Sequence, residues 1–122
     1  MEYINTTPHQ INVFGEDGTL LFLLRPALDV RASTQETIVS CENRVLITKQ
    51  VLGEPAIKNL HGELIAMEDL PLEGLVVSLI AASSLRAAGF AGQLLTPNTA
   101  PGRVIRDESG RILGCTGFVQ QP

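Results

Sequence analysis

The residues of this sequence best suited to bind an anion are three arginines near its C-terminal end, Arg103, Arg106 and Arg111. The planar guanidinium group matches phosphate oxygens and often donates two hydrogen bonds to them. Arg103 and Arg106 fall on opposite faces of a strand, so at most some of the three converge on one ligand. The structural alternative is cross-strand pairing with Asp107 or Glu108, which contributes little at a surface. Because a loop bearing an asparagine precedes the cluster, phosphate binding gains weight.

That loop, residues 90–102, contains Phe90, Asn98 and Thr99. One aromatic ring with an amide and a hydroxyl suits a nucleobase, because the ring stacks on the base and the amide reads its donor and acceptor edge. An ordinary solvated connection, with Phe90 at the end of a helix, explains the same residues equally well.

A third candidate is the segment Asn5-Thr6-Thr7-Pro8-His9 near the N-terminus. Its side chains can hydrogen-bond a ligand, and His9 is included among the candidate ligand-binding residues. They can equally close a turn at the entrance to the first strand, and for the segment taken alone this structural role is favoured.

The sequence contains no motif that indicates catalysis. His9 and His61 have no carboxylate or cysteine at metal-ligand spacing, and the GxSxG, Walker and GxGxxG motifs are absent. Cys115 could pair with a histidine as a nucleophile, but its Ile-Leu-Gly-Cys context favours a buried structural cysteine. We therefore expect no catalytic residues, no metal and no cofactor.

Composition predicts one domain, residues 1–122, with a formal net charge of −4 that argues against binding a nucleic-acid polymer. The N-terminus does not have the pattern of a signal peptide, and the longest apolar run is too short to span a bilayer. Cys41 and Cys115 have no CxxC spacing, which favours a reduced pair. A cytoplasmic protein without a membrane partner is expected.

The predicted fold class is α+β, with residues 1–70 mainly β. Apolar runs over 11–14 and 19–24 flank a Gly-Glu-Asp-Gly hairpin turn. Runs rich in β-branched residues predict further strands, in one N-terminal antiparallel sheet, at 30–32, 37–41, 44–48 and 64–66.

One long helix is predicted over residues 73–89, followed by a loop and by a hairpin within 103–118. The apolar residues of 73–89 cover most of the helix circumference, so a second subunit is expected to bury what one sheet leaves exposed. This predicts a homo-oligomer built around the helix. A central helix wrapped by the chain's own sheet is the alternative.

The stretch from Asn5 to Val13 with the following Glu16-Asp17-Gly18 turn resembles the opening of small phage-encoded proteins. Those proteins share a Val-Ser-rich helix, matched by residues 75–81, and a final Val-Arg-Asp-x-x-Gly-x-Ile-x-Gly hairpin, matched by residues 105–114. The middle, residues 25–68, matches poorly.

This order of elements is similar to that of the phage anti-Thoeris sponge family, whose members are oligomers that sequester cyclic ADP-ribose isomers without cleaving them. Some also hold cyclic di- or trinucleotides at a separate site. The resemblance implies that Phe90 and Asn98 take the base, that Arg106 and Arg111 hold phosphates, and that pockets lie between subunits.

The preferred hypothesis is a phage counter-defence protein of the infected bacterial cytoplasm that sequesters a cyclic nucleotide signal. One alternative is a protein-interaction module, acting as a host-enzyme inhibitor or a minor virion component, which predicts an exposed apolar patch. The less favoured alternative is a nucleotide-degrading enzyme.

Overall fold

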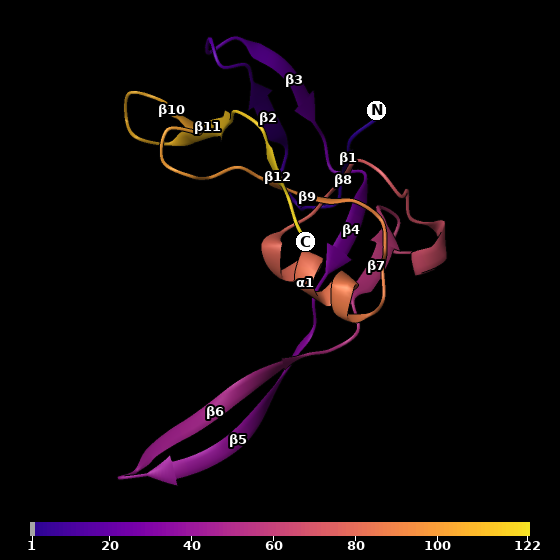
Figure 1. Ribbon diagram of the computed structural model, residues 1–122, viewed down its shortest axis with the longest axis vertical. Helices are drawn as coiled ribbons and strands as arrows, with labels where there is room; N and C mark the ends of the chain where they lie inside the picture. Colours follow the sequence, from indigo (N-terminus) through magenta and orange to yellow (C-terminus); the bar gives the residue numbers. More distant parts are fainter. Residues whose placement is uncertain (1) are drawn as a thin grey trace.

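The computed structural model describes residues 2–122 and places them mainly in strands, with one short helix in that range (Figure 1). The arrangement is α+β and dominated by β-structure. The strands are β1 (Ile4–Asn5), β2 (Ile11–Phe14), β3 (Leu20–Leu24), β4 (Leu28–Arg31), β5 (Thr34–Glu42), β6 (Val45–Leu52), β7 (Ala56–Asn59), β8 (Leu75–Val76), β9 (Leu94–Pro97), β10 (Val104–Arg106), β11 (Ile112–Cys115) and β12 (Phe118–Gln120). The α-helix is α1 (Leu79–Ala87), and a 3-10 turn, η1, spans Met67–Asp69.

Two four-stranded sheets form the body of the molecule. One has the order β1-β8-β9-β12 and the other β10-β11-β2-β3. The N-terminal hairpin β2–β3 and the C-terminal hairpin β10–β11 share the second sheet, because Cys115 of β11 pairs in parallel with Val13 of β2. Both hairpins, which the Asp-Gly and Ser-Gly turns predicted, are confirmed.

The core lies where α1 packs near the first sheet, and its fully buried side chains include Leu75, Val77, Leu85 and Leu94. The helix begins at Leu79 because Ser78 precedes it in an extended conformation and its hydroxyl accepts the Ala81 N–H at 3.2 Å. Such a cap satisfies a backbone donor that the first helical turn leaves free.

The prediction of a long helix over 73–89 is wrong. Leu75 and Val76 form the buried strand β8 between β1 and β9, and only residues 79–87 are helical. Gly74 adopts a φ of +78°, which is incompatible with a right-handed helix. The apolar residues that appeared to surround a helix therefore belong to a strand, so the argument for a subunit interface around that helix no longer holds.

The prediction of one N-terminal sheet also needs correction, because residues 1–70 contribute to four separate sheets. Strands β4 and β7 pair with each other, and the predicted strand 64–66 is reduced to one bridge between Leu64 and Lys58. The predicted loop at Thr96 is still strand, since β9 runs to Pro97 and pairs with β12. Within residues 2–122 no helix is long and apolar enough to cross a membrane.

Strands β5 and β6 form a two-stranded ribbon, residues 34–52, which we call the arm. It extends away from the rest of the molecule, and its strands pair with each other alone among the described strands (Figure 1). The turn residues Asn43 and Arg44 both have positive φ, which is the geometry of a type I′ hairpin turn. At its base, the buried Ser84 hydroxyl of α1 donates to the Gly53 carbonyl at 3.1 Å.

Candidate functional site

A cavity of about 560 Å³ lies between the two four-stranded sheets, and we call it the aromatic pocket. Strands β2 and β3 of one sheet and β9 and β12 of the other contribute to its wall. The lining residues are Tyr3, Val13, Phe14, Gly15, Glu16, Leu21, Phe22, Gln93, Leu95, Thr116, Gly117, Phe118 and Gln120. The chain has four phenylalanines, one tyrosine and no tryptophan, so all its aromatic residues except Phe90 line this cavity.

Three of these rings pack together. The Tyr3 ring stacks on Phe22 with centroids 5.6 Å apart and an angle of 8° between the planes. On Phe118 it is tilted by 47°, with centroids 5.1 Å apart. All three residues are half-buried and line the cavity. Accessible ring surface is what a flat, unsaturated ligand needs for stacking.

Two glutamines add hydrogen-bonding groups to the same wall. The Gln93 side-chain oxygen accepts the Gly74 N–H at 2.9 Å, which fixes its orientation, and its amide nitrogen contacts the Gln120 oxygen at 3.3 Å. The Gln120 amide nitrogen makes no hydrogen bond to residues 2–122 and remains available as a donor. A carboxamide offers both a donor and an acceptor, which suits the edge of a heterocyclic base.

One cation pairs with a residue that lines the pocket. The Arg103 guanidinium lies 3.7 Å from the Glu16 carboxylate, which lines the cavity and is largely exposed. The Arg103 carbonyl accepts hydrogen bonds from the backbone N–H and the hydroxyl of Thr116, another lining residue. A loose pair between exposed side chains contributes little, so Arg103 can turn to an anionic ligand at small cost.

Comparisons of the chain with protein-family models, with curated proteins and with solved structures gave no match. Within residues 2–122, no cluster of three or more His, Cys, Asp or Glu side chains is arranged to hold a metal ion. The site is therefore described from its own geometry.

Of the arginines predicted to bind phosphate, the structure brings Arg103 alone into contact with residues lining the aromatic pocket. Arg106, on the edge strand β10, donates to the Gly110 carbonyl at 2.9 Å. Arg111 is exposed at the start of β11. Neither forms an ion pair in the part of the chain that the structure describes, so the alternative of pairing with Asp107 or Glu108 is not seen there.

The residues predicted to bind a base lie in two different places, and none of them lines the aromatic pocket. Phe90 is 5% exposed and belongs to the hydrophobic core, so it presents no ring face to a ligand in this conformation. Asn98 and Thr99 line a different cavity, of about 400 Å³, beside Leu79 at the start of α1. The Asn98 side-chain oxygen accepts the Ala100 N–H at 3.1 Å and thereby stabilises its own loop.

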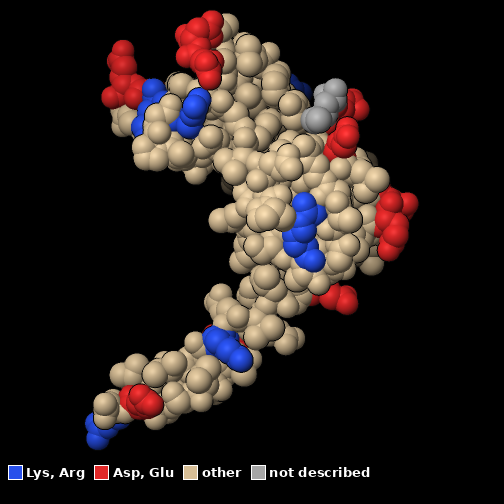
Figure 2. Space-filling model, in the orientation of Figure 1, with Lys and Arg blue, Asp and Glu red and all other residues tan. Residues whose placement is uncertain are grey.

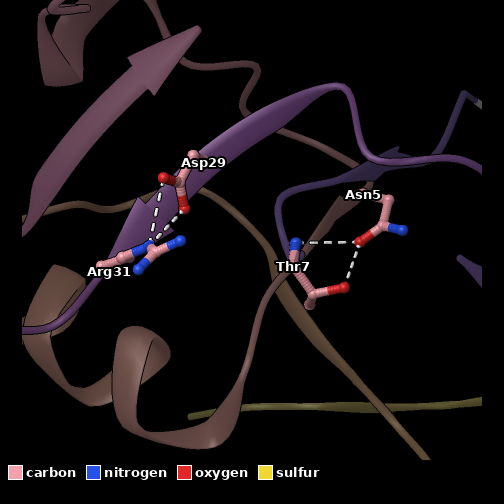
Figure 3. Close-up of polar contacts among 4 residues, drawn as sticks. All are labelled: Asn5, Thr7, Asp29 and Arg31. Carbon is pink, nitrogen blue, oxygen red and sulfur yellow. Dashed lines mark hydrogen bonds and ion pairs between the residues drawn. The ribbon is translucent and has the colours of Figure 1, made fainter. Parts of the chain in front are cut away.

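The N-terminal segment folds into a loop held by Asn5, which is 1% exposed. Its side-chain oxygen accepts both the N–H and the hydroxyl of Thr7, at 2.9 and 2.7 Å (Figure 3). Its amide nitrogen donates to the carbonyls of His9 and Leu24. Asn5 thus uses its hydrogen-bonding groups within the chain, whereas the His9 side chain is exposed.

Sequence reasoning missed Tyr3, Phe22, Phe118 and the two glutamines. Tyr3 precedes the first strand, Phe22 lies in an apolar strand, and Phe118 stands almost at the chain end. No local pattern connects them, because only the pairing between sheets brings them together. The sequence did indicate that any stacking site had to be built from five aromatic residues, because it contains no others.

Proposed function

We propose that this protein captures a nucleotide signal in the aromatic pocket and holds it without cleaving it. In the phage setting that the sequence resemblance implies, the ligand is a bacterial immune signal, such as a cyclic ADP-ribose isomer or a cyclic oligonucleotide. The protein then acts in counter-defence by lowering the concentration of the free signal.

The concentration of four of the five aromatic residues around one cavity supports this proposal most strongly. Stacking of a base on an aromatic side chain is worth about 1–3 kcal/mol, and every base has a face that can stack. A cavity of about 560 Å³ falls in the range that small-molecule ligands occupy.

The polar groups of the pocket would orient a ligand that stacks on this apolar surface. The Gln120 amide suits the base edge, and Arg103, beside the lining residue Glu16, suits a phosphate. The proposal thus keeps the predicted phosphate role for Arg103 and transfers stacking from Phe90 to Tyr3, Phe22 and Phe118.

A thermal-shift screen with cyclic ADP-ribose isomers and with cyclic di- and trinucleotides tests the proposal. At a hundredfold excess over the dissociation constant, a ligand stabilises the fold by about 2.7 kcal/mol. For a domain of this size that corresponds to a shift of several degrees. Ligand recovered after heat release should be chemically intact by chromatography. An altered ligand would indicate an enzyme, and no shift with any compound would contradict nucleotide capture.

A matched set of variants locates the site. Phe118→Leu keeps an apolar side chain but removes the ring, so we expect affinity to fall roughly tenfold or more. Phe118→Tyr retains the ring and should retain binding. Asn98→Ala changes the separate cavity beside α1 and should leave affinity unchanged. Loss of binding in Asn98→Ala but not in Phe118→Leu would move the site to that second cavity.

The arm supports a second candidate function, a protein-interaction module. It exposes the apolar surface that this alternative predicted, with Ile38 67% and Val45 60% exposed. A failed ligand screen would favour this function.

A further inference from the structure

The arm carries far more exposed apolar surface than its length explains. It spans residues 34–52 but holds seven of the eighteen large apolar side chains that are exposed in the described part of the chain. They are Ile38, Val39, Val45, Leu46, Ile47, Val51 and Leu52. An isolated two-stranded ribbon is marginally stable in water, so a ribbon of this composition needs a covering surface.

The arm has equal numbers of acidic and basic residues, and this restricts the kind of partner that can cover it. Two acidic residues, Glu36 and Glu42, balance two basic residues, Arg44 and Lys49. Most of its surface is uncharged in Figure 2. An arm without net charge is poorly suited to nucleic acid, and it does not repel a second arm of the same composition.

The strand register separates the two faces of the ribbon. Ile38 pairs with Thr48 and Cys41 with Leu46, and directly paired residues share a face. These four residues form one face of the outer half of the arm, and none of them is charged. The opposite face of that half carries Glu42 among its residues, and Lys49 follows on the same face one pair further in, so this face is better suited to solvent contact.

We propose that a second copy of this chain covers the arm, with the uncharged outer strips of the two arms packed together across a twofold axis and Glu36, further in on the same face, left at the rim. Such an interface is isologous, so it requires a self-complementary surface, and an uncharged strip of Ile38, Cys41, Leu46 and Thr48 meets that requirement. This interface lies away from the helix and is independent of the nucleotide proposal.

One face of the arm is smaller than the area that each partner buries in a standard interface. A ribbon of nine residues is roughly 30 Å long and about 10 Å wide, so one face covers roughly 300 Å². Each partner of a standard interface buries about 800 Å². Contact between the arms alone is therefore smaller than a standard interface, so the proposal requires further contact between each arm and the partner's body. The outline of the molecule is concave beside the arm in Figure 2.

Sedimentation velocity across a concentration series tests the proposal. The wild-type chain should sediment as a dimer, and Ile38→Thr combined with Leu46→Thr should give a monomer, because threonine keeps β-propensity but removes the apolar contact. The matched control is Leu64→Thr combined with Leu72→Thr, which removes two exposed leucines outside the arm and should remain dimeric. Circular dichroism checks that each variant is folded.

The native cysteines provide a second readout. Cys41 is exposed on the proposed interface whereas Cys115 is buried, so a short bismaleimide should join two chains through Cys41. The crosslink should disappear in Cys41→Ser and in the arm variant. A wild-type monomer at every concentration would overturn the proposal and assign the arm to a different protein. A dimer that survives the arm substitutions would overturn it as well.

Discussion

Asn5 is a buried polar residue whose contribution to stability can be isolated. Asn5→Ala would remove four hydrogen bonds and leave the carbonyls of His9 and Leu24 without that donor. With about 1 kcal/mol for each net hydrogen bond, we expect the free energy of unfolding to fall by roughly 2–4 kcal/mol. Urea denaturation measures this. Asn12→Ala, which removes two exposed hydrogen bonds, one to the Leu113 carbonyl and one from the Gln10 amide, is the control and should cost less.

Gly74 tests backbone strain in the same way. It has a φ of +78°, and a Cβ added there would collide with the backbone oxygen of Glu2. Gly74→Ala should therefore destabilise the fold by at least about 2 kcal/mol, since the left-handed conformation alone costs about 1–2 kcal/mol. Gly110 has a φ of +87° with open space around it, so Gly110→Ala should show the conformational cost alone. Equal thermal shifts for both variants would contradict the steric argument.

Asp107 gives the C-terminal hairpin turn a pH dependence. A hydrogen bond from the Ser109 hydroxyl, and then one from the Arg111 N–H, lower the pKa of this exposed carboxyl below its usual value of 3.8. Because the folded pKa is the lower one, the stabilisation is present above the unfolded pKa and is lost as pH falls through the folded value. The protection of the β10–β11 amides, measured as their exchange rate relative to the intrinsic rate at each pH, should fall below about pH 4. In Asp107→Asn that acid-dependent loss of protection should be absent.

The candidate site was only partly predictable from residue types. Arginine chemistry singled out Arg103, whose guanidinium lies 3.7 Å from the lining residue Glu16, and its role in binding stays a prediction. Phe90 attracted attention because it stands beside a polar loop, yet its ring fills the core. Tyr3 and Phe118 could not be linked from the sequence, since their proximity depends on how the chain's two ends assemble.

At the scale of elements, local signals predicted local structure. The β2–β3 and β10–β11 hairpins followed from turn residues between apolar runs, and both are present. The helix was overextended because Leu75 and Val76 are as compatible with a buried strand as with a helix. Parallel pairing of β8 with β1 and β9 decides between them, and that pairing depends on distant residues.

The arm's turn offers a prediction at this scale. Arg44 has a φ of +65°, a conformation that glycine adopts without strain. Arg44→Gly creates the preferred Asn-Gly pair of a type I′ turn and should stabilise the arm by about 1 kcal/mol. Amide hydrogen exchange of β5 and β6, measured in the monomeric arm variant, reports this as slower exchange. Arg44→Ala removes the charge but keeps the strain, so it should produce no such slowing.

At the scale of the whole molecule, the two proposed surfaces lie on different parts of the chain. The arm projects from one end, and the sheet β10-β11-β2-β3, which forms part of the aromatic pocket, lies toward the other (Figure 1). No residue of β5 or β6 lines the pocket, so the arm takes no part in its wall within one chain. The pocket between subunits that the sponge resemblance implies stays a prediction.

This separation predicts that assembly and capture can be removed independently. Ile38→Thr combined with Leu46→Thr should abolish the dimer and leave the nucleotide affinity of each chain unchanged, because every lining residue remains in place. Phe118→Leu should weaken nucleotide binding and leave the dimer intact. Isothermal titration calorimetry gives affinity and stoichiometry for each variant, and sedimentation gives its assembly state. If the monomeric variant bound the nucleotide substantially more weakly, the partner chain would have to complete the pocket, as the sponge family implies. Unchanged affinity with one ligand per chain would establish that each copy captures its ligand alone, so the dimer would serve another purpose.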